Sequence, residues 1–174
     1  MGRTDGTGGG DVSYADGTTV SAEKSRLEIE ALVSKYAGRD ADFSSGRTAG
    51  KAAILFVANG RRVRFVVPLP TDAEAVQNGK RKNSRRPATD TQKAEWIEQE
   101  TRRRWRCLLL AIKAKLEVVA TGISTFEEEF AMNMVLPDGK TVGDVIIPEI
   151  ARIYLAGRGR LMLGAVREGS GDAS

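Results

Sequence analysis

Residues 89–122, TDTQKAEWIEQETRRRWRCLLLAIKAKLEVVATG, combine a long apolar pattern with a cluster of arginines, and the rest of the chain is organised around them. Thr89 opens a capping box and Gly122 suits the left-handed position that follows a helix, so one helix is expected to fill the stretch. At about 100° per residue, apolar residues gather on two sides of this helix, one around Trp105 and the other around Cys107. Such a helix usually lies between two layers, and the stretch therefore predicts a long, largely buried central helix.

Residues 52–57 and 62–69 predict two antiparallel strands, because Asn59-Gly60 between them is the strongest two-residue signal for a hairpin. With this pair as the turn, alternate residues form one apolar face: Ile54, Phe56, Val63, Phe65 and Val67. The opposite face carries two arginines beside apolar residues: Arg62 and Arg64 with Leu55, Val57 and Val66. We expect the apolar face to bury against the central helix. The arginine face is expected to be either the solvent-exposed side of the sheet or part of a nucleic-acid-binding surface.

The whole pattern predicts an α+β fold in a single domain, with a small antiparallel β-meander packed on the long central helix and additional helices at both ends. The other expected elements are a helix from Ser21 to about Gly38, a short strand at 41–44, and helices over 126–134 and 141–154. The domain is expected to span residues 21–156, with a flexible basic loop at 71–90, a disordered tail over 1–20 and a flexible tail over 157–174.

Positive charge is concentrated in one part of the chain. Residues 80–115 contain twelve Lys or Arg against four Asp or Glu, a net charge of +8, whereas the other residues contain fifteen against nineteen, a net charge of −4. This asymmetry points to an anionic partner more strongly than the total of +4 does. The composition therefore favours nucleic acid, with single-stranded DNA as the leading expectation, or an acidic protein surface.

The candidate contacts with phosphates lie on the hairpin, in the basic loop and near the start of the central helix. They are Arg62, Arg64, Lys80, Arg81, Lys82, Arg85, Arg86, Arg102, Arg103 and Arg106. Trp96, if its side of the helix is exposed, adds a ring on which a base can stack. The alternative is that these basic side chains form a solvated rim, with their stems on apolar surface and their charges in water.

The composition excludes or weakens several classes of enzyme. The chain has no histidine, which removes His-based acid–base catalysis, Ser-His-Asp and Cys-His nucleophile systems and His-containing zinc sites. The single cysteine, Cys107, excludes an intramolecular disulfide, fits a reducing cytosol and is expected to be inert among apolar neighbours. No cofactor and no metal site are expected. No membrane span is expected either, since no apolar run approaches the ~20 residues that a spanning helix needs. One dense acidic group leaves a magnesium-dependent nuclease open as an alternative: Glu127, Glu128, Glu129, Asp138 and Asp144.

Four segments of the chain stand in an order that carries a resemblance to known proteins. They are RRVRFVVPLP (61–70), RRRWRCLLLAIKAKLEVVATG (102–122), ISTFEEEF (123–130) and VLPDGKTVG (135–143). In this order they resemble an uncharacterised family of small proteins encoded by phages and prophages, over about residues 25–154. The resemblance implies a phage source and the cytoplasm of an infected bacterial host. It brings no established activity and no catalytic residues, but phage genes of this size often serve replication or recombination, which favours nucleic acid.

Three functions are thus expected, in this order. The first is a non-catalytic nucleic-acid-binding protein, for single-stranded DNA in phage replication or recombination. The second is a protein-binding module, an inhibitor or adaptor of a host or replisome protein, whose basic surface meets an acidic partner. The third is the magnesium-dependent nuclease.

Overall fold

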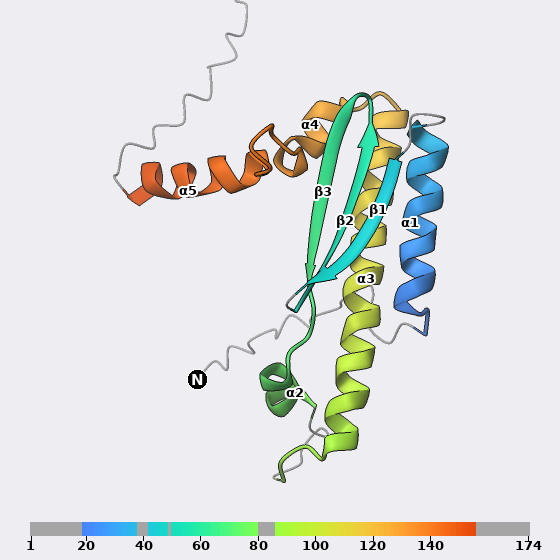
Figure 1. Cartoon of the computed structure of the whole chain (residues 1–174), viewed down its shortest axis with the longest axis vertical. Helices are drawn as coiled ribbons and strands as arrows, with labels where there is room; N and C mark the ends of the chain where they lie inside the picture. Colours follow the sequence, from blue (N-terminus) through green and yellow to red (C-terminus); the bar gives the residue numbers. More distant parts are fainter. Residues whose placement is uncertain (1–18, 38–41, 49, 80–85, 156–174) are drawn as a thin grey trace, which may run out of the picture.

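The computed structural model describes residues 19–37, 42–48, 50–79 and 86–155, and it has the α+β fold with a β-meander. In Figure 1 the sheet lies against α1 and α3, α2 lies beside the N-terminal half of α3, and α5 leads away from the body. The elements along the chain are α1 (Ala22–Ala37), β1 (Asp42–Thr48), β2 (Lys51–Ala58), β3 (Arg61–Pro68), α2 (Asp72–Asn78), α3 (Asp90–Ala120), α4 (Phe126–Phe130), the 3-10 helix η2 (Ala131–Asn133) and α5 (Val142–Leu155).

The sheet is an antiparallel meander with the strand order β1-β2-β3. Asn59 and Gly60 in the turn between β2 and β3 have positive φ angles of 50° and 68°, as a two-residue turn that follows the twist of the strands requires. This turn sets the register, in which Phe56 lies opposite Val63. The predicted hairpin and its register are confirmed.

The strand predicted at 41–44 is longer than expected, since β1 runs to Thr48 and pairs with β2 over its whole length. Its sequence, DFSSGRT, has no alternating apolar pattern, and Phe43 is its one large apolar residue. Every residue of β1 except Phe43 is exposed. Pairing with β2, rather than burial of its own side chains, therefore defines this edge strand.

The inner face of the sheet, which we define as the face that carries Ile54 and Phe56, is covered by α1, α3 and α4. Phe130 meets Phe56 edge to face with ring centroids 6.1 Å apart, and it stacks on Phe126 at 4.6 Å. The core is built from both the sheet and the helices: Ala52, Ile54, Phe56, Ala58, Val63 and Val67 with Ile29, Val33, Trp105, Leu109, Ile112, Leu116, Phe126 and Phe130. The predicted packing of the hairpin on the central helix is thus confirmed.

The central helix α3 begins and ends as predicted. The side chain of Thr89 accepts a hydrogen bond in a capping box, and Gly122 has a φ angle of 75°. The buried apolar residues of α3 lie on the side that contains Trp105, whereas Cys107 and Ala111 on the opposite side are exposed. The expectation of a helix between two layers, apolar and buried on both sides, is therefore wrong. Alanine and cysteine carry little apolar surface, so leaving them in water costs little free energy.

The segment 71–90, predicted as one flexible basic loop, contains the helix α2. Thr71 and Glu74 form a complete capping box, in which the Thr71 side chain accepts from the Glu74 backbone N–H and the Glu74 carboxylate accepts from that of Thr71. Ala75 is fully buried where α2 packs on α3. The prediction of a loop over the whole segment is wrong, and its residues 80–85 lie outside the described part.

The part of the chain after α3 brings the α5 helix to the edge of the sheet. The helix predicted over 126–134 ends early, since α4 passes into η2 at Ala131. A short bridge between Val63 and Met134 then continues the sheet beyond β3. Thr141 accepts a hydrogen bond from the Asp144 backbone N–H and opens α5, as predicted.

Candidate functional site: the outer sheet face and helix α5

The arginines of α3, which the sequence offered as phosphate contacts, are held by carboxylates. Arg102 pairs with Glu98 one turn earlier on the same helix, and Arg106 pairs with Glu28 of α1 at 3.2 Å. Arg103 pairs with Glu100 at 2.7 Å. These pairs reduce the positive charge that α3 presents to an anion.

A cluster around Glu100 ties α2 to α3. Arg104 donates to Glu100 at 2.8 Å and to Glu74 of α2 at 2.8 Å, while a third hydrogen bond goes to the Pro68 carbonyl at 2.9 Å. Burial alone would raise the pKa of Glu100, but hydrogen bonds from Arg103 and Arg104 outweigh it and hold this pKa below its ordinary value. Glu100 is therefore a charged, buried anchor of the fold.

The remaining candidates are Trp96, Arg86 and four basic residues of the segment before α3. Trp96 is half-buried, so only part of its ring is open for stacking. Arg86 is exposed and takes part in an interaction of its own. The candidates Lys80, Arg81, Lys82 and Arg85 lie outside the described residues. The contact of these residues with phosphates thus stays a prediction.

The two arginines of the hairpin, Arg62 and Arg64, differ in their contacts. Both point to the outer sheet face, which we define as the face of the sheet opposite α1 and α3. Arg64 is half-buried and donates to the Gly139 carbonyl at 2.9 Å and to Asp144 at 3.1 Å, so it fastens the start of α5 to β3. Arg62 is exposed and, among the described residues, makes no hydrogen bond or ion pair through its side chain. The Arg62 side chain is thus accessible to a binding partner, whereas the Arg64 side chain is used in hydrogen bonds within the fold.

The start of α5 is fixed by Asp144. The backbone N–H of Thr141, then the Thr141 hydroxyl and finally Arg64 stabilise the charged carboxylate and hold the pKa of Asp144 below its ordinary value. The same oxygen accepts from the Thr141 N–H at 2.8 Å and from Arg64. One carboxylate therefore caps α5 and anchors it to the sheet.

The outer sheet face is hollowed beside these anchors. Three adjoining hollows of about 280, 410 and 490 Å³ share residues of β2 and β3. The first two share Ala53, and the last two share Val66. Ile147 of α5 lines the third, so the hollows run from the sheet to the base of α5. This surface is apolar along its floor, with Lys51 and Arg62 on its rim.

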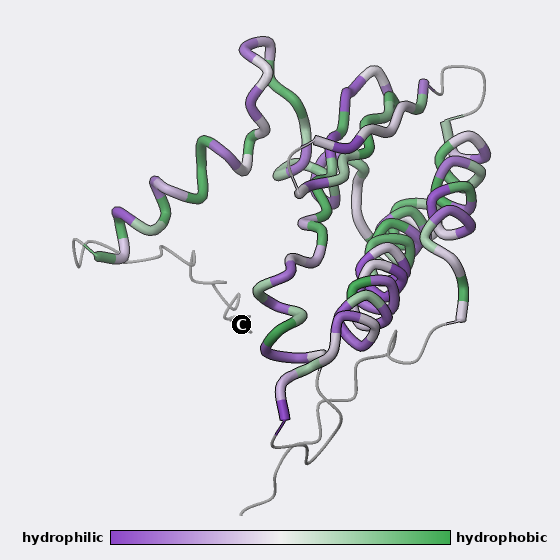
Figure 2. The backbone as a smooth tube through the Cα atoms, turned by 60° about the horizontal axis from the view of Figure 1, so that its bottom comes forward, coloured by the Kyte–Doolittle hydropathy of each residue, from purple (hydrophilic) through white to green (hydrophobic). Residues whose placement is uncertain are grey.

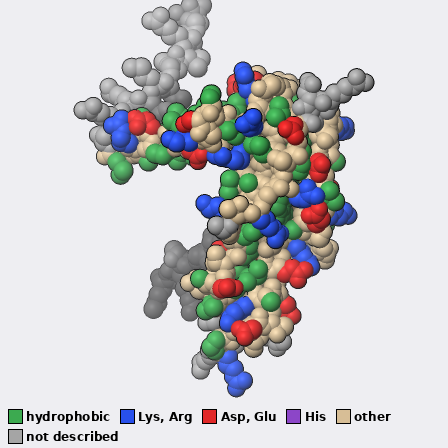
Figure 3. Space-filling model, viewed as in Figure 1, with side chains coloured by type: hydrophobic (Ala, Val, Ile, Leu, Met, Phe, Trp, Pro, Cys, Tyr) green, Lys and Arg blue, Asp and Glu red, His purple; other side chains and the backbone are tan. Residues whose placement is uncertain are grey.

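Helix α5 exposes most of its apolar side chains. Apart from its base, it lies away from the body (Figure 1), and hydrophobic residues recur along its length (Figure 2). Figure 3 shows these side chains on the surface of the projecting arm. Seven large apolar residues of α5 are between 39% and 89% exposed: Val145, Ile146, Ile147, Ile150, Ile153, Tyr154 and Leu155. No helix in the described ranges is both long and apolar enough to cross a bilayer.

Five of these residues form one stripe on α5, which we call the α5 stripe. At about 100° per residue they fall within an arc of about 120°. They are Ile146, Ile147, Ile150, Ile153 and Tyr154. Glu149 and Arg152, which pair with each other, lie outside this arc, with Glu149 at its border. The spacing was readable in the sequence as an amphipathic pattern, but its exposure was not, since that depends on what the rest of the chain covers.

The carboxylates considered for a nuclease each contact a different partner. Glu128 caps α4 through Thr125, Glu129 pairs with Lys115 at 3.3 Å, and Glu127 lies 3.8 Å from Arg61. Within the described ranges no three His, Cys, Asp or Glu side chains are grouped so that they could hold a metal ion. The nuclease alternative therefore gains no support from this part of the chain.

Comparison of the chain with protein-family models, with curated proteins and with solved structures gives no match. The resemblance to a phage family stays a prediction, and the case for function rests on the geometry of the chain itself.

Proposed function

We propose that this chain is a non-catalytic protein-binding module that works through the α5 stripe and the adjoining outer sheet face. The observation that carries the proposal is the set of seven large apolar residues of α5 that are between 39% and 89% exposed. Apolar surface in water costs about 25 cal/mol per Å². Contiguous apolar patches larger than a few hundred Å² usually mark interaction sites.

A second copy of the chain is the occupant that this surface favours. Two-fold pairs are the commonest oligomers, and their interface uses the same patch on both copies. Each partner buries roughly 800 Å² in a standard interface, and the seven exposed side chains of α5 offer apolar surface for such a contact. The outer sheet face adds Val66, which is 51% exposed.

Sedimentation velocity or light scattering over a range of protein concentrations tests this proposal. We expect a dimer that dissociates on dilution, and we expect Ile150→Glu to raise the dissociation constant at least about a hundredfold, because it places a charge in the apolar contact. Leu27→Glu is the matched control, since Leu27 is a single exposed leucine on α1. A wild-type chain that is monomeric at every concentration, or equal effects of both variants, would contradict self-association.

Nucleic-acid binding is the second candidate, supported by the cations Lys51 and Arg62. Both are exposed, and neither forms a hydrogen bond or ion pair through its side chain with another described residue. This function predicts binding to single-stranded oligonucleotides whose affinity falls with salt, by about 0.7 log units per tenfold salt for each phosphate neutralised. Lys51→Glu with Arg62→Glu should abolish the binding. Absence of binding at low salt would remove this candidate.

A further inference from the structure

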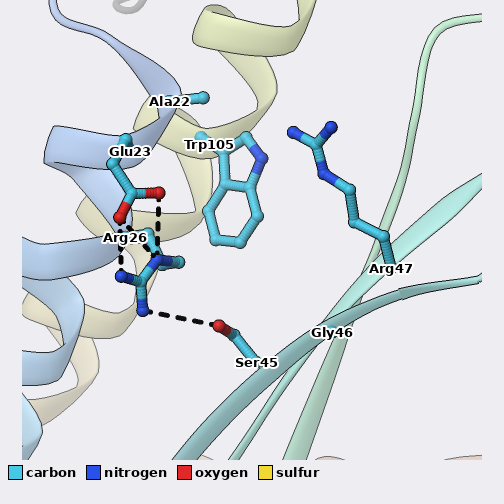
Figure 4. Close-up of a pocket in the computed structure, with 7 residues that line it drawn as sticks. All are labelled: Ala22, Glu23, Arg26, Ser45, Gly46, Arg47 and Trp105. Atoms are coloured by element: carbon cyan, nitrogen blue, oxygen red, sulfur yellow. Dashed lines mark hydrogen bonds and ion pairs between the residues drawn. The ribbon is translucent and has the colours of Figure 1, made fainter.

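A pocket between α1, β1 and α3, away from α5, is lined by hydrogen-bond donors that have no acceptor among the described residues. The pocket has a volume of about 240 Å³. Its lining comes from the first two turns of α1, from the middle of β1 and from one residue of α3: Ala22, Glu23, Arg26, Ser45, Gly46, Arg47 and Trp105. Figure 4 shows these side chains around the pocket.

Trp105 contributes a buried donor without an acceptor. The residue is 4% exposed, and its Nε1–H has no hydrogen-bond partner among the described residues. Buried polar groups almost always have a partner, and an indole nitrogen can only donate. The group that satisfies Trp105 must therefore present an acceptor.

Arg47 provides a positive charge on the facing side. Figure 4 shows the nitrogen-bearing edge of the Trp105 indole turned toward the Arg47 guanidinium. Arg47 is exposed and, in the described part of the chain, forms no ion pair. Two donors turned toward each other are best served by one shared acceptor, and a negatively charged oxygen is the strongest acceptor for a guanidinium.

Arg26 and its partners bring one more donor to the pocket. The Glu23 carboxylate accepts from Nε and Nη2 of Arg26 at 2.6–3.2 Å, and Arg26 also pairs with Glu30 at 3.4 Å. The hydrogen bond from Arg26 holds the pKa of Glu23 below its ordinary value, so this pair is fully ionised. Arg26 also donates to the Ser45 hydroxyl oxygen at 3.4 Å, which leaves the Ser45 O–H as a donor. The first residues of α1 place the positive end of a helix dipole at the same pocket.

We propose that this pocket binds a phosphate group between Arg47 and the Nε1–H of Trp105. A phosphate has enough oxygens to accept from Arg47, Trp105 and Ser45 together, whereas a chloride ion offers no separate acceptor oxygens. The site contains no residue of α5, so it stands independently of the proposed protein-binding function.

The test follows the Nε1–H resonance of Trp105 by NMR during titration with inorganic phosphate, with sodium chloride at matched ionic strength as the reference. We expect a saturable shift of this resonance that chloride does not produce. Arg47→Gln should raise the dissociation constant at least about tenfold, because it removes a charge-assisted hydrogen bond. Lys24→Gln is the matched control, since it removes an exposed cation of α1 that does not line this pocket.

Two further arms distinguish the source of the phosphate. A shift with an oligonucleotide that has no terminal phosphate supports recognition of a nucleic-acid backbone, and a shift confined to inorganic phosphate and 5′-phosphorylated ligands supports a terminal phosphate. The proposal is overturned if no phosphate compound shifts the resonance, if chloride shifts it equally, or if Arg47→Gln binds as tightly as the wild-type chain.

Discussion

At the scale of single residues, Glu100 shows how this protein uses its unusual number of arginines. One carboxylate accepts from both Arg103 and Arg104, and Arg104 reaches on to Glu74 of α2. A run of basic residues that reads as an anion-binding surface is therefore largely the positive half of an internal network. The network joins α2 to α3, whereas Lys51 and Arg62 at the outer sheet face form no ion pair with another described residue.

Glu100→Gln should lower the free energy of unfolding at pH 7 by about 1–3 kcal/mol, because Arg103 and Arg104 lose a charged acceptor. Since the pKa of Glu100 is lowered in the folded chain, its contribution is present above the ordinary value of 4.5 and is lost as the pH falls below it. Denaturant titrations from pH 7 to pH 3 check both points. Glu95→Gln, an exposed position on the same helix, is the control, and an equal effect of the two variants would contradict the role of Glu100.

Ser25 gives a second residue-scale prediction, of opposite sign. It is 0% exposed on α1, and its hydroxyl has no hydrogen-bond partner among the described residues. Ser25→Ala removes this buried, unsatisfied group and should raise the free energy of unfolding by about 1 kcal/mol. Ser34→Ala changes an exposed serine of the same helix and should have almost no effect. A loss of stability in Ser25→Ala would show that its hydroxyl has a partner in solution.

At the scale of elements, α5 depends on a small number of anchors at its base. Arg64 and Thr141 both bond to Asp144, and α5 packs beside η2. Arg64→Leu keeps an apolar stem on the sheet but removes both anchoring hydrogen bonds of this arginine. We expect the backbone amides at the base of α5 to exchange with solvent about tenfold faster, while the core strands keep their rates. Arg62→Leu is the control, and equal exchange in both variants would contradict an anchoring role for Arg64.

The elements themselves show what local sequence could and could not predict. Thr89 and Gly122 fixed the ends of α3, and Asn59-Gly60 fixed the hairpin register, because caps and turns act over a few residues. Thr71 and Glu74 formed an equally local signal for the start of α2. This signal was missed because the surrounding segment is polar and was interpreted as a loop.

The neutralisation of the arginines could not be predicted in this way. Arg106 meets Glu28 at a distance of 78 residues along the chain, and Arg104 meets Glu74 at a distance of 30. Such ion pairs depend on how α1 and α2 pack against α3. Neither the number of charged residues nor the helical periodicity of the sequence describes this packing. The same limit applies to α5, whose apolar stripe was readable although its exposure was not.

At the scale of the whole molecule, the chain consists of a body with a filled core and a projecting helix that keeps its apolar side chains in water (Figure 3). We propose that another copy covers the α5 stripe in solution. This arrangement would explain why α5 can be both strongly apolar and almost free of contacts with its own body. It would also bring the cationic rim of the outer sheet face into the interface.

Hydrogen–deuterium exchange of α5 as a function of protein concentration tests this claim most directly. If a second copy covers the stripe, the amides from Ile146 to Tyr154 should exchange slowly at high concentration and much faster on dilution, whereas the amides of β2 should not change. Ile150→Glu should exchange at the fast rate at every concentration. Fast exchange of α5 in the wild-type chain at all concentrations would contradict the account.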